Sequence, residues 1–304
     1  MIPRIRLAPN GPDCSRLVYG TWRLLADAAG AAPRALCARL QRCVDLGITT
    51  IDTAEIYGGY AVERALGEAL ALDPSLRARL EIVSKAGIYV PVPQHPERTV
   101  AFYDASAAQL IRSVEESLRL LRTDHLDLFL VHRPDWLTAA DDTAEGLNRL
   151  LRDGKILSAG ASNYSVHQFD ALNARVDRPL VTNQVEFSLL HMDPIYDGTA
   201  DQCQRLGIAP MAWSPLAQGR LMRADDEAGA RVQALAAELG PKYDGATTDQ
   251  LALAWIMAHP SRPLPIIGTN RLERVESAAR AADLRLTRED WYALWSAAQG
   301  RRIP

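Results

Sequence analysis

Cysteine is scarce in this sequence, and the positions of the four cysteines exclude several kinds of site. Cys14, Cys37, Cys43 and Cys203 form no C-x-x-C pair, so neither a zinc ribbon nor a redox dithiol is indicated. Cys37 and Cys43 fall in a helical pattern, where buried and unreactive thiols are the expected interpretation. With no disulfide framework indicated, the chain is predicted to act in the reducing cytoplasm.

Long hydrophobic runs and an excess of basic charge are also absent. The longest apolar stretches fall far short of the about 20 residues that span a membrane. The opening MIPRIRLAPNGPDCS contains no signal-peptide core. A formal net charge of −3 provides no basic field for nucleic acid. The sequence therefore predicts neither a membrane partner nor a nucleic-acid partner, and we expect a monomer or a weak oligomer.

No low-complexity run or Ser/Gly linker divides the chain, which favours one domain over residues 1–304. Hydrophobic residues make up 48% and charged residues 23% of the chain, as is typical of a globular protein. The length suits a single α/β barrel, which takes about 250 residues. No G-x-G-x-x-G follows the first predicted strand, and this absence argues against the open dinucleotide-binding sheet.

Strand-like and helix-like segments alternate along the whole chain. Apolar and β-branched runs predict eight strands, at 17–22, 48–54, 80–87, 126–132, 156–162, 180–187, 208–214 and 264–269. Apolar residues at helical spacing predict helices at 35–46, 106–122 and 143–153, with Gly47 and Gly154 as stop signals. A final helix is predicted to begin near Thr287 and Asp290. Eight such units favour a closed (β/α)8 TIM barrel with a C-terminal helical extension.

An extra segment precedes the first strand. The stretch IRLAPNGPDCSRLVYG contains an Asn-Gly turn signal followed by Pro. It predicts a short N-terminal hairpin that closes the bottom of the barrel, with a disordered lead-in as the alternative.

Four residues that can carry chemistry stand at the ends of buried strands. Asp52, Tyr57, Lys85 and His132 end or follow the runs TTIDTAEIY, LEIVSK and LDLFLVH. The carboxyl ends of barrel strands form the catalytic face, so these side chains are predicted to meet in a proton-donating site. Taken one at a time, each has a structural interpretation: a loop aromatic, a solvated lysine, a core histidine or an ion pair.

The sequence around these residues resembles the aldo-keto reductases. The run IDTAEIYGG, followed by Glu63, Arg64 and Gly67, is similar to that family's first signature. The pieces IVSK, DLFLVH, GASN, NQVEFS and WSPLAQGRL then follow in the family's order and spacing. The resemblance extends from Gly20 to about residue 280. The pieces TWRL, HRPD and MAWSPL resemble a subgroup of bacterial cytoplasmic oxidoreductases of undefined substrate.

The resemblance implies reduction of a carbonyl, an aldehyde or ketone, by hydride from a nicotinamide. Tyr57 matches the acid that protonates the forming alkoxide. The Lys85 ammonium would lower the pKa of Tyr57 from its ordinary value of about 10, and Asp52 would pair with Lys85. His132 matches the residue that donates an N–H to the carbonyl oxygen.

The resemblance also implies the cofactor NADPH, with NADH as an alternative. It places the nicotinamide against Thr21, Asp52, Ser162, Asn163, Gln184 and Trp213. It places the pyrophosphate under a loop that contains Ser214, Pro215, Leu216, Gly219 and Leu221. It assigns the 2′-phosphate to Gly268, Thr269, Asn270 and Arg274. Two features depart from the family pattern. Gly268 stands where many relatives have Lys, and Ser277 and Ala278 stand where they have the Glu and Asn that bind adenine. The contacts to adenine are therefore expected to be weaker, or to be made by Glu276 instead.

The substrate itself is not defined by the sequence. Trp22, Tyr57, Ile88, Tyr89 and His132 are expected to line the mouth of the barrel. The segments GIYVPVPQHPERTV and RPDWLTAADD are expected to form rim loops. Two other functions remain open. One is a regulatory subunit of the same fold that holds nucleotide with little turnover. The other is a metal-dependent hydrolase or a lyase, although the remaining histidines are scattered and predict no metal site.

Overall fold

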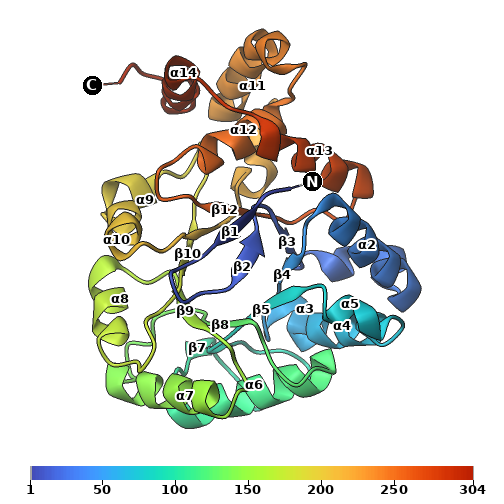
Figure 1. The fold of residues 1–304 in the computed structure, drawn as a ribbon, viewed down its shortest axis with the longest axis vertical. Coiled ribbons are helices and arrows are strands. Elements are labelled where there is room, and N and C mark those ends of the chain that lie inside the picture. Colours follow the sequence, from blue (N-terminus) through green and yellow to red (C-terminus); the bar gives the residue numbers. More distant parts are fainter. Residues whose placement is uncertain (1, 304) are drawn as a thin grey trace.

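The computed structural model describes residues 2–303, and its centre is a closed barrel of eight parallel strands (Figure 1). Each of the eight predicted strand ranges contains one barrel strand, so the predicted TIM barrel is confirmed. Neighbouring strands pair in parallel, and the last strand closes onto the first. In barrel order these strands are β3 (Val18–Gly20), β4 (Thr50–Asp52), β5 (Glu81–Ala86), β8 (Leu128–Val131), β9 (Ala159–Ser162), β10 (Asn183–Glu186), β11 (Met211–Trp213) and β12 (Leu264–Ile267).

A ring of helices surrounds the barrel (Figure 1). The helices that follow the eight strands are α2 (Pro33–Leu46), α4 (Val62–Leu70), α6 (Ala107–Leu121), α7 (Ala140–Arg152), α8 (Val166–Asn173), α10 (Thr199–Leu206), α12 (Thr248–Met257) and α13 (Leu272–Arg280). The predicted helices correspond to α2, α6 and α7. In α2 the predicted apolar face is buried through Leu36, Leu40 and Cys43, and Gly47 ends the helix in the left-handed conformation at φ 87°.

Shorter elements complete the loops between strands and helices. They are the helices α1 (Ala28–Ala31), α3 (Tyr57–Tyr60), α5 (Pro74–Arg77) and α9 (Asp193–Tyr196), the 3₁₀ turns η1 (Leu24–Ala26), η2 (Ala217–Met222), η3 (Gly240–Tyr243) and η4 (Ala281–Asp283), and the hairpin of β6 (Ile88–Tyr89) and β7 (Phe102–Tyr103). The first strand of this hairpin lies in the segment 87–100 that was expected to form a rim loop, and the second lies just beyond it.

The C-terminal extension is helix α14 (Arg288–Gln299), which packs beside α11 (Glu227–Leu239) at one side of the barrel (Figure 1). The predicted cap forms, because the Thr287 side chain accepts from the Asp290 backbone N–H at 3.2 Å. Trp291 of α14 stacks on Trp255 of α12 with ring centroids 4.6 Å apart. The extension is therefore held by a large aromatic contact and a capped start.

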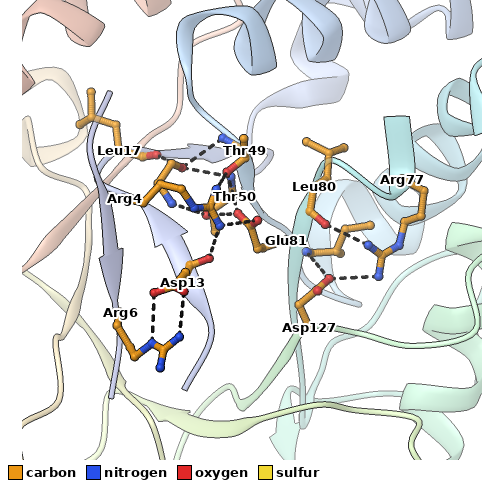
Figure 2. A network of polar contacts seen from close by, with 12 residues as sticks. Arg4, Arg6, Asp13, Leu17, Thr49, Thr50, Arg77, Leu80, Glu81 and Asp127 are labelled. Atoms are coloured by element: carbon orange, nitrogen blue, oxygen red, sulfur yellow. Dashed lines mark hydrogen bonds and ion pairs between the residues drawn. The ribbon is translucent and has the colours of Figure 1, made fainter. Parts of the chain in front are cut away.

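The N-terminal segment forms the predicted hairpin, with β1 (Arg4–Arg6) antiparallel to β2 (Asp13–Ser15). Figure 2 shows how it is fastened to the strand starts. Arg4 of the hairpin bonds Thr49 at 2.7 Å and Glu81 at 2.8 Å. A separate contact beside it joins Arg77 of α5 to Asp127 at 3.0 Å, just before β8. Thr49 and Glu81 stand at the beginnings of β4 and β5. The hairpin therefore covers the bottom of the barrel, and the opposite face carries the open strand ends.

Two further expectations concern reactivity and membranes. Burial raises the pKa of the thiols of Cys14, Cys43 and Cys203 to about 12, which agrees with unreactive cysteines. No helix within residues 2–303 is both long enough and apolar enough to cross a bilayer.

Candidate active site

Lys85 is the centre of a buried polar cluster at the open face of the barrel. Its ammonium, 0% exposed, donates to Asp52 Oδ1 at 2.8 Å, to the Thr53 carbonyl at 2.7 Å and to the Tyr57 hydroxyl at 3.2 Å. Asp52 ends β4 and Lys85 lies near the end of β5, so neighbouring strands bring the pair together. A buried ammonium with three acceptors is fully satisfied, and one of these acceptors is the titratable hydroxyl of Tyr57.

The turn after Tyr57 depends on glycine. Gly58 and Gly59 both adopt the left-handed conformation, at φ 58° and 63°. The positive φ favours glycine at position 58, and a Cβ there would also crowd the Leu25 side chain at 2.6 Å. This tight turn lets the chain reverse directly after Tyr57 and keeps its ring over the barrel.

The charges of the cluster are set by burial and by the ion pair. Burial alone would lower the pKa of Lys85, but the charges of Asp52 and Tyr57 hold that pKa above its ordinary 10.5. Burial raises the pKa of Tyr57 above 10.0, and the Lys85 ammonium opposes this rise without cancelling it. The expectation of a lowered Tyr57 pKa is therefore wrong as a net effect. Tyr57 keeps its proton at neutral pH and can act as an acid.

His132 follows β8 and faces Tyr57, with ring centroids 6.0 Å apart at an interplanar angle of 71°. Burial, followed by the charges of Lys85 and Arg133, holds the pKa of His132 well below 6.5, so the imidazole is neutral. Its Nδ1 is buried without a hydrogen-bond partner in the described chain. A proton on Nδ1 would have no acceptor, so the single ring proton belongs on Nε2, from which it can be donated to a ligand oxygen.

Three side chains expected at the nicotinamide already bond to one another. Asn163 Nδ2 donates to Ser162 Oγ at 2.8 Å and to the His132 carbonyl at 3.3 Å. Trp213 Nε1 donates to Asn163 Oδ1 at 3.0 Å, and Ser162 Oγ donates to the Gln184 carbonyl at 2.9 Å. The donors of Asn163 and Ser162 are thus occupied, and acceptor lone pairs remain. A carboxamide NH₂ group fits such a site through its two N–H donors.

The backbone beside this cluster is strained at two positions. Asn163 and Ser214 lie at φ 60° and 50°, which is uncommon for residues other than glycine. Such conformations cost about 1–3 kcal/mol and concentrate at ligand sites.

Thr21 lies across the barrel rim and is buried, with its hydroxyl donating to the Asp52 carbonyl at 2.9 Å.

The loop expected over the pyrophosphate has three half-buried residues at the rim and two buried ones. Ser214, Leu216 and Gly219 are half-buried at the rim, Pro215 is buried, and a Cβ on Gly219 would meet no atom within 4 Å. Leu221 lies deeper in the loop. Its side chain is fully buried in the core around α11 and α12, and its carbonyl accepts from Gln233 at 3.0 Å. Leu221 therefore supports the loop from beneath.

The segment expected at the 2′-phosphate follows β12. A Cβ on Gly268 would likewise meet no atom within 4 Å, so this rim position is open. Thr269 is half-buried, and Arg274 is exposed in the first turn of α13, with no carboxylate in ion-pair contact among residues 2–303. The half-buried Asn270 donates its amide to the Arg23 carbonyl at 2.6 Å, which ties this segment to the loop after β3, and it stays a predicted cofactor contact. Glu276, the expected adenine contact, instead pairs with Arg42 at 2.8 Å.

The residues expected to line the substrate mouth differ in how exposed they are. Trp22 is 61% exposed and packs edge-on against Tyr57, with ring centroids 4.9 Å apart. Ile88 is half-buried in the β6–β7 hairpin. Tyr89 is a correction. Side chains alternate in direction along a strand, and the buried Tyr89 hydroxyl bonds Ser113 of α6 at 3.0 Å. It packs behind the hairpin rather than in the mouth.

Sequence reasoning missed a pair of buried carboxyl groups behind the cluster. Glu63 accepts from Ser84 and Ser117, and Glu55 accepts from Ser113 at 3.1 Å. Burial raises the pKa of both carboxyl groups to about 7. The available signal was an acidic residue on the apolar face of α4, where Val62 and Leu66 are buried. Within residues 2–303, no group of three or more acidic, histidine or cysteine side chains is placed to hold a metal.

Comparison with known proteins gives consistent results. A model described as the aldo/keto reductase family matches residues 16–299. The chain is 44% identical to the oxidoreductase YdhF of Escherichia coli (strain K12) over 100% of both chains. It is 40% identical to a 6-dehydroglucose reductase of Agrobacterium fabrum over 96% of each chain. It is 36% identical to a protein of the same name from Novosphingobium aromaticivorans, over 98% of this chain and 96% of that one.

Two solved structures share the fold. A thermostable aldo-keto reductase, Tm1743, solved with the inhibitor epalrestat, superimposes with a TM-score of 0.81 at 27% identity, covering 97% of this chain and 100% of the other. An aldo/keto reductase from Klebsiella pneumoniae, solved with NADP and acetate, gives a TM-score of 0.77 at 29% identity, covering 95% and 94%.

Proposed function

This chain belongs to the aldo/keto reductase family of oxidoreductases, and on that premise we propose that it reduces an aldehyde or ketone to an alcohol with NADPH. The observation that carries the proposal is the Lys85 ammonium, fully buried between Asp52 and the Tyr57 hydroxyl. Burial of a charge is costly unless it is paired, and here Asp52 supplies the pair while the third ammonium proton is left for the Tyr57 hydroxyl. Beside the protonated Tyr57 phenol, the Lys85 ammonium is placed to stabilise the phenolate that forms when Tyr57 gives its proton to a developing alkoxide.

Each residue of the cluster has a separate task in this proposal. Bound NADPH supplies the hydride. His132 Nε2 donates a hydrogen bond to the carbonyl oxygen and holds it near the Tyr57 hydroxyl. Tyr57 gives its proton to that oxygen, and the phenolate that remains is stabilised by the Lys85 ammonium at 3.2 Å. Asp52 keeps Lys85 charged and aimed.

The cofactor proposal rests on the residues that remain available at the rim. Ser162, Asn163 and Gln184 offer acceptors to a carboxamide, and Trp213 is held by Asn163 where it can stack on the nicotinamide. Gly219 and Gly268 leave room for close backbone approach. The unpaired Arg274 selects NADPH over NADH through the 2′-phosphate. The structural relative from Klebsiella pneumoniae was solved with NADP, which supports this choice.

A sugar aldehyde is the first substrate to test. Two relatives that align over nearly the whole chain carry the name 6-dehydroglucose reductase. Arg133, half-buried beside His132, can bond substrate hydroxyls, and the exposed Trp22 offers an aromatic face to a sugar ring.

The test is a screen for NADPH oxidation over 6-dehydroglucose, other aldehydes, ketones and quinones. The Tyr57→Phe variant is the matched control, because it removes one hydroxyl and keeps the ring. It should lose about 100-fold or more in turnover, the scale of a lost general acid, while its Kd for NADPH stays close to wild type. Wild-type turnover in Tyr57→Phe would reject the assignment. NADPH binding without reduction of any carbonyl would favour the regulatory function.

A further inference from the structure

Gln184 and Asp52 meet across the centre of the barrel although they are 132 residues apart in sequence. Gln184 Nε2 donates to Asp52 Oδ2 at 2.7 Å, and the other carboxylate oxygen accepts from Lys85 Nζ at 2.8 Å. β4 and β10 are the second and sixth barrel strands, and inward side chains from alternate strands share one layer in this fold. Asp52 is therefore clamped from two sides, by a charge and by an amide.

The orientation of the Gln184 amide is fixed by this contact. An ionised carboxylate can only accept hydrogen bonds, so the nitrogen of the amide must face Asp52. The nitrogen also lies 3.8 Å from Met211 Sδ, which is a weak acceptor. Oε1 is then the atom that remains for a ligand. Gln184 is 2% exposed, so a rotation that broke the contact would leave a buried carboxylate oxygen without its donor.

These contacts join two sites that the proposed function treats separately. We propose that Gln184 is a positioning residue for proton transfer: its amide holds Asp52 in the orientation that keeps Lys85 against the Tyr57 hydroxyl. The proposal rests on the function given above, and adds that the carboxamide-binding Oε1 and the Asp52-binding Nε2 belong to one rigid amide. A nicotinamide carboxamide bound to Oε1 would thereby help to hold Asp52 and Lys85 in place beside the Tyr57 hydroxyl.

Other groups face the same cluster and enter any titration of it. His132 on the β8 side is neutral, and its ring lies against Tyr57. Glu63 on α4 senses the charge of Lys85 from outside the barrel. Neither contacts Asp52, so a change at Gln184 reaches Tyr57 through the Asp52–Lys85 pair.

The experiment measures the ionisation of Tyr57 in cofactor-free protein, by ultraviolet difference titration against the Tyr57→Phe variant. Gln184→Met conserves volume and removes the amide. Ser162→Ala is the matched control, because it removes another carboxamide partner, on β9, whose hydroxyl bonds the backbone carbonyl of Gln184 and not the side-chain amide that holds Asp52. Kd for NADPH is measured for each variant by fluorescence titration, and the single-turnover rate is followed against pH at saturating NADPH.

Both variants should weaken NADPH binding several-fold. Only Gln184→Met should move the Tyr57 titration upward, by about half a pH unit or more, because a loosened Lys85 stabilises the phenolate less. The pH profile of the single-turnover rate should move with it. Gln184→Glu serves if the Met variant does not fold: a second carboxylate beside Asp52 should move the titration further upward.

The proposal is overturned if the titration in Gln184→Met or Gln184→Glu superimposes on wild type, since Gln184 then serves the cofactor alone. It is also overturned if Ser162→Ala shifts the titration equally, since the shift then reports general loosening. The titration uses no substrate, so a protein that reduces no carbonyl would fail the proposed function and still decide this point.

Discussion

Removal of Lys85 should test the buried ion pair and the proton donor together. In Lys85→Met the thioether fills the volume of the lysine stem, so little cavity forms. The Asp52 carboxylate, 2% exposed, loses its partner at 2.8 Å, and the Thr53 carbonyl loses its donor at 2.7 Å. Breaking a buried pair by removing one partner costs about 3–5 kcal/mol. We expect the free energy of unfolding to fall by that amount at neutral pH.

The pH dependence of the pair has a definite sign. The pKa of Lys85 in the fold lies above its ordinary 10.5, so the contribution of the pair is fully present at neutral pH. It is lost only as the pH rises through the raised value, in the alkaline range.

The assay is urea unfolding of cofactor-free protein, followed by tryptophan fluorescence. It compares wild type with Lys85→Met, with Asp52→Asn and with the double variant Asp52→Asn/Lys85→Met. The double variant buries no charge and should lose only about 1–2 kcal/mol, so the two changes should couple by roughly 2 kcal/mol or more. Turnover should fall in all three variants. Additive losses in the double variant, or a loss below about 1 kcal/mol in Lys85→Met, would refute the view of a buried, mutually dependent pair.

Two other predictions concern the cofactor and a buried acid. Arg274→Met should raise Kd for NADPH by roughly ten-fold or more, the size of a lost charge-assisted hydrogen bond, and leave Kd for NADH nearly unchanged. Parallel fluorescence titrations at one salt concentration check this, and an equal loss for both cofactors would contradict it. Glu63, with a folded pKa of about 7 against an ordinary 4.5, holds its proton longer in the fold than in the unfolded chain. The contribution of Glu63 to the free energy of unfolding should therefore fall by about 1.4 kcal/mol between about pH 6 and pH 8. Glu63→Gln should remove that part of the pH slope in urea unfolding, while Glu55, with the same raised pKa, keeps its own.

The architecture could be predicted from the sequence because its signals are local. Apolar runs mark each strand, helical spacing marks the buried face of α2, and Gly47 and Thr287 mark where helices end and begin. Parallel strands that alternate with helices leave few topologies. Once the strands close into a barrel, residues at their carboxyl ends must share one rim. Asp52, Lys85 and His132 could therefore be grouped before any contact was known.

The details that only the tertiary structure decided are those that depend on distant chain. Tyr89 and Asn270 have side chains that suit a binding site, yet one bonds Ser113 and the other holds the Arg23 carbonyl. Leu221 stands in a loop, but the core beneath that loop takes its side chain. Sequence spacing predicts which residues lie near the open rim of the barrel. It does not predict the direction in which each of their side chains points.

The electrostatics show the same division most clearly. The sequence identified an ammonium near a phenol, which predicts a lowered Tyr57 pKa, but burial outweighs that charge and raises the pKa. The Gln184 contact with Asp52 joins residues 132 positions apart. No periodicity encodes such a pair, because it arises only when the closed barrel places two opposite strands face to face. Local pattern determined which groups are present, and burial and non-local contact determined their charge states and partners.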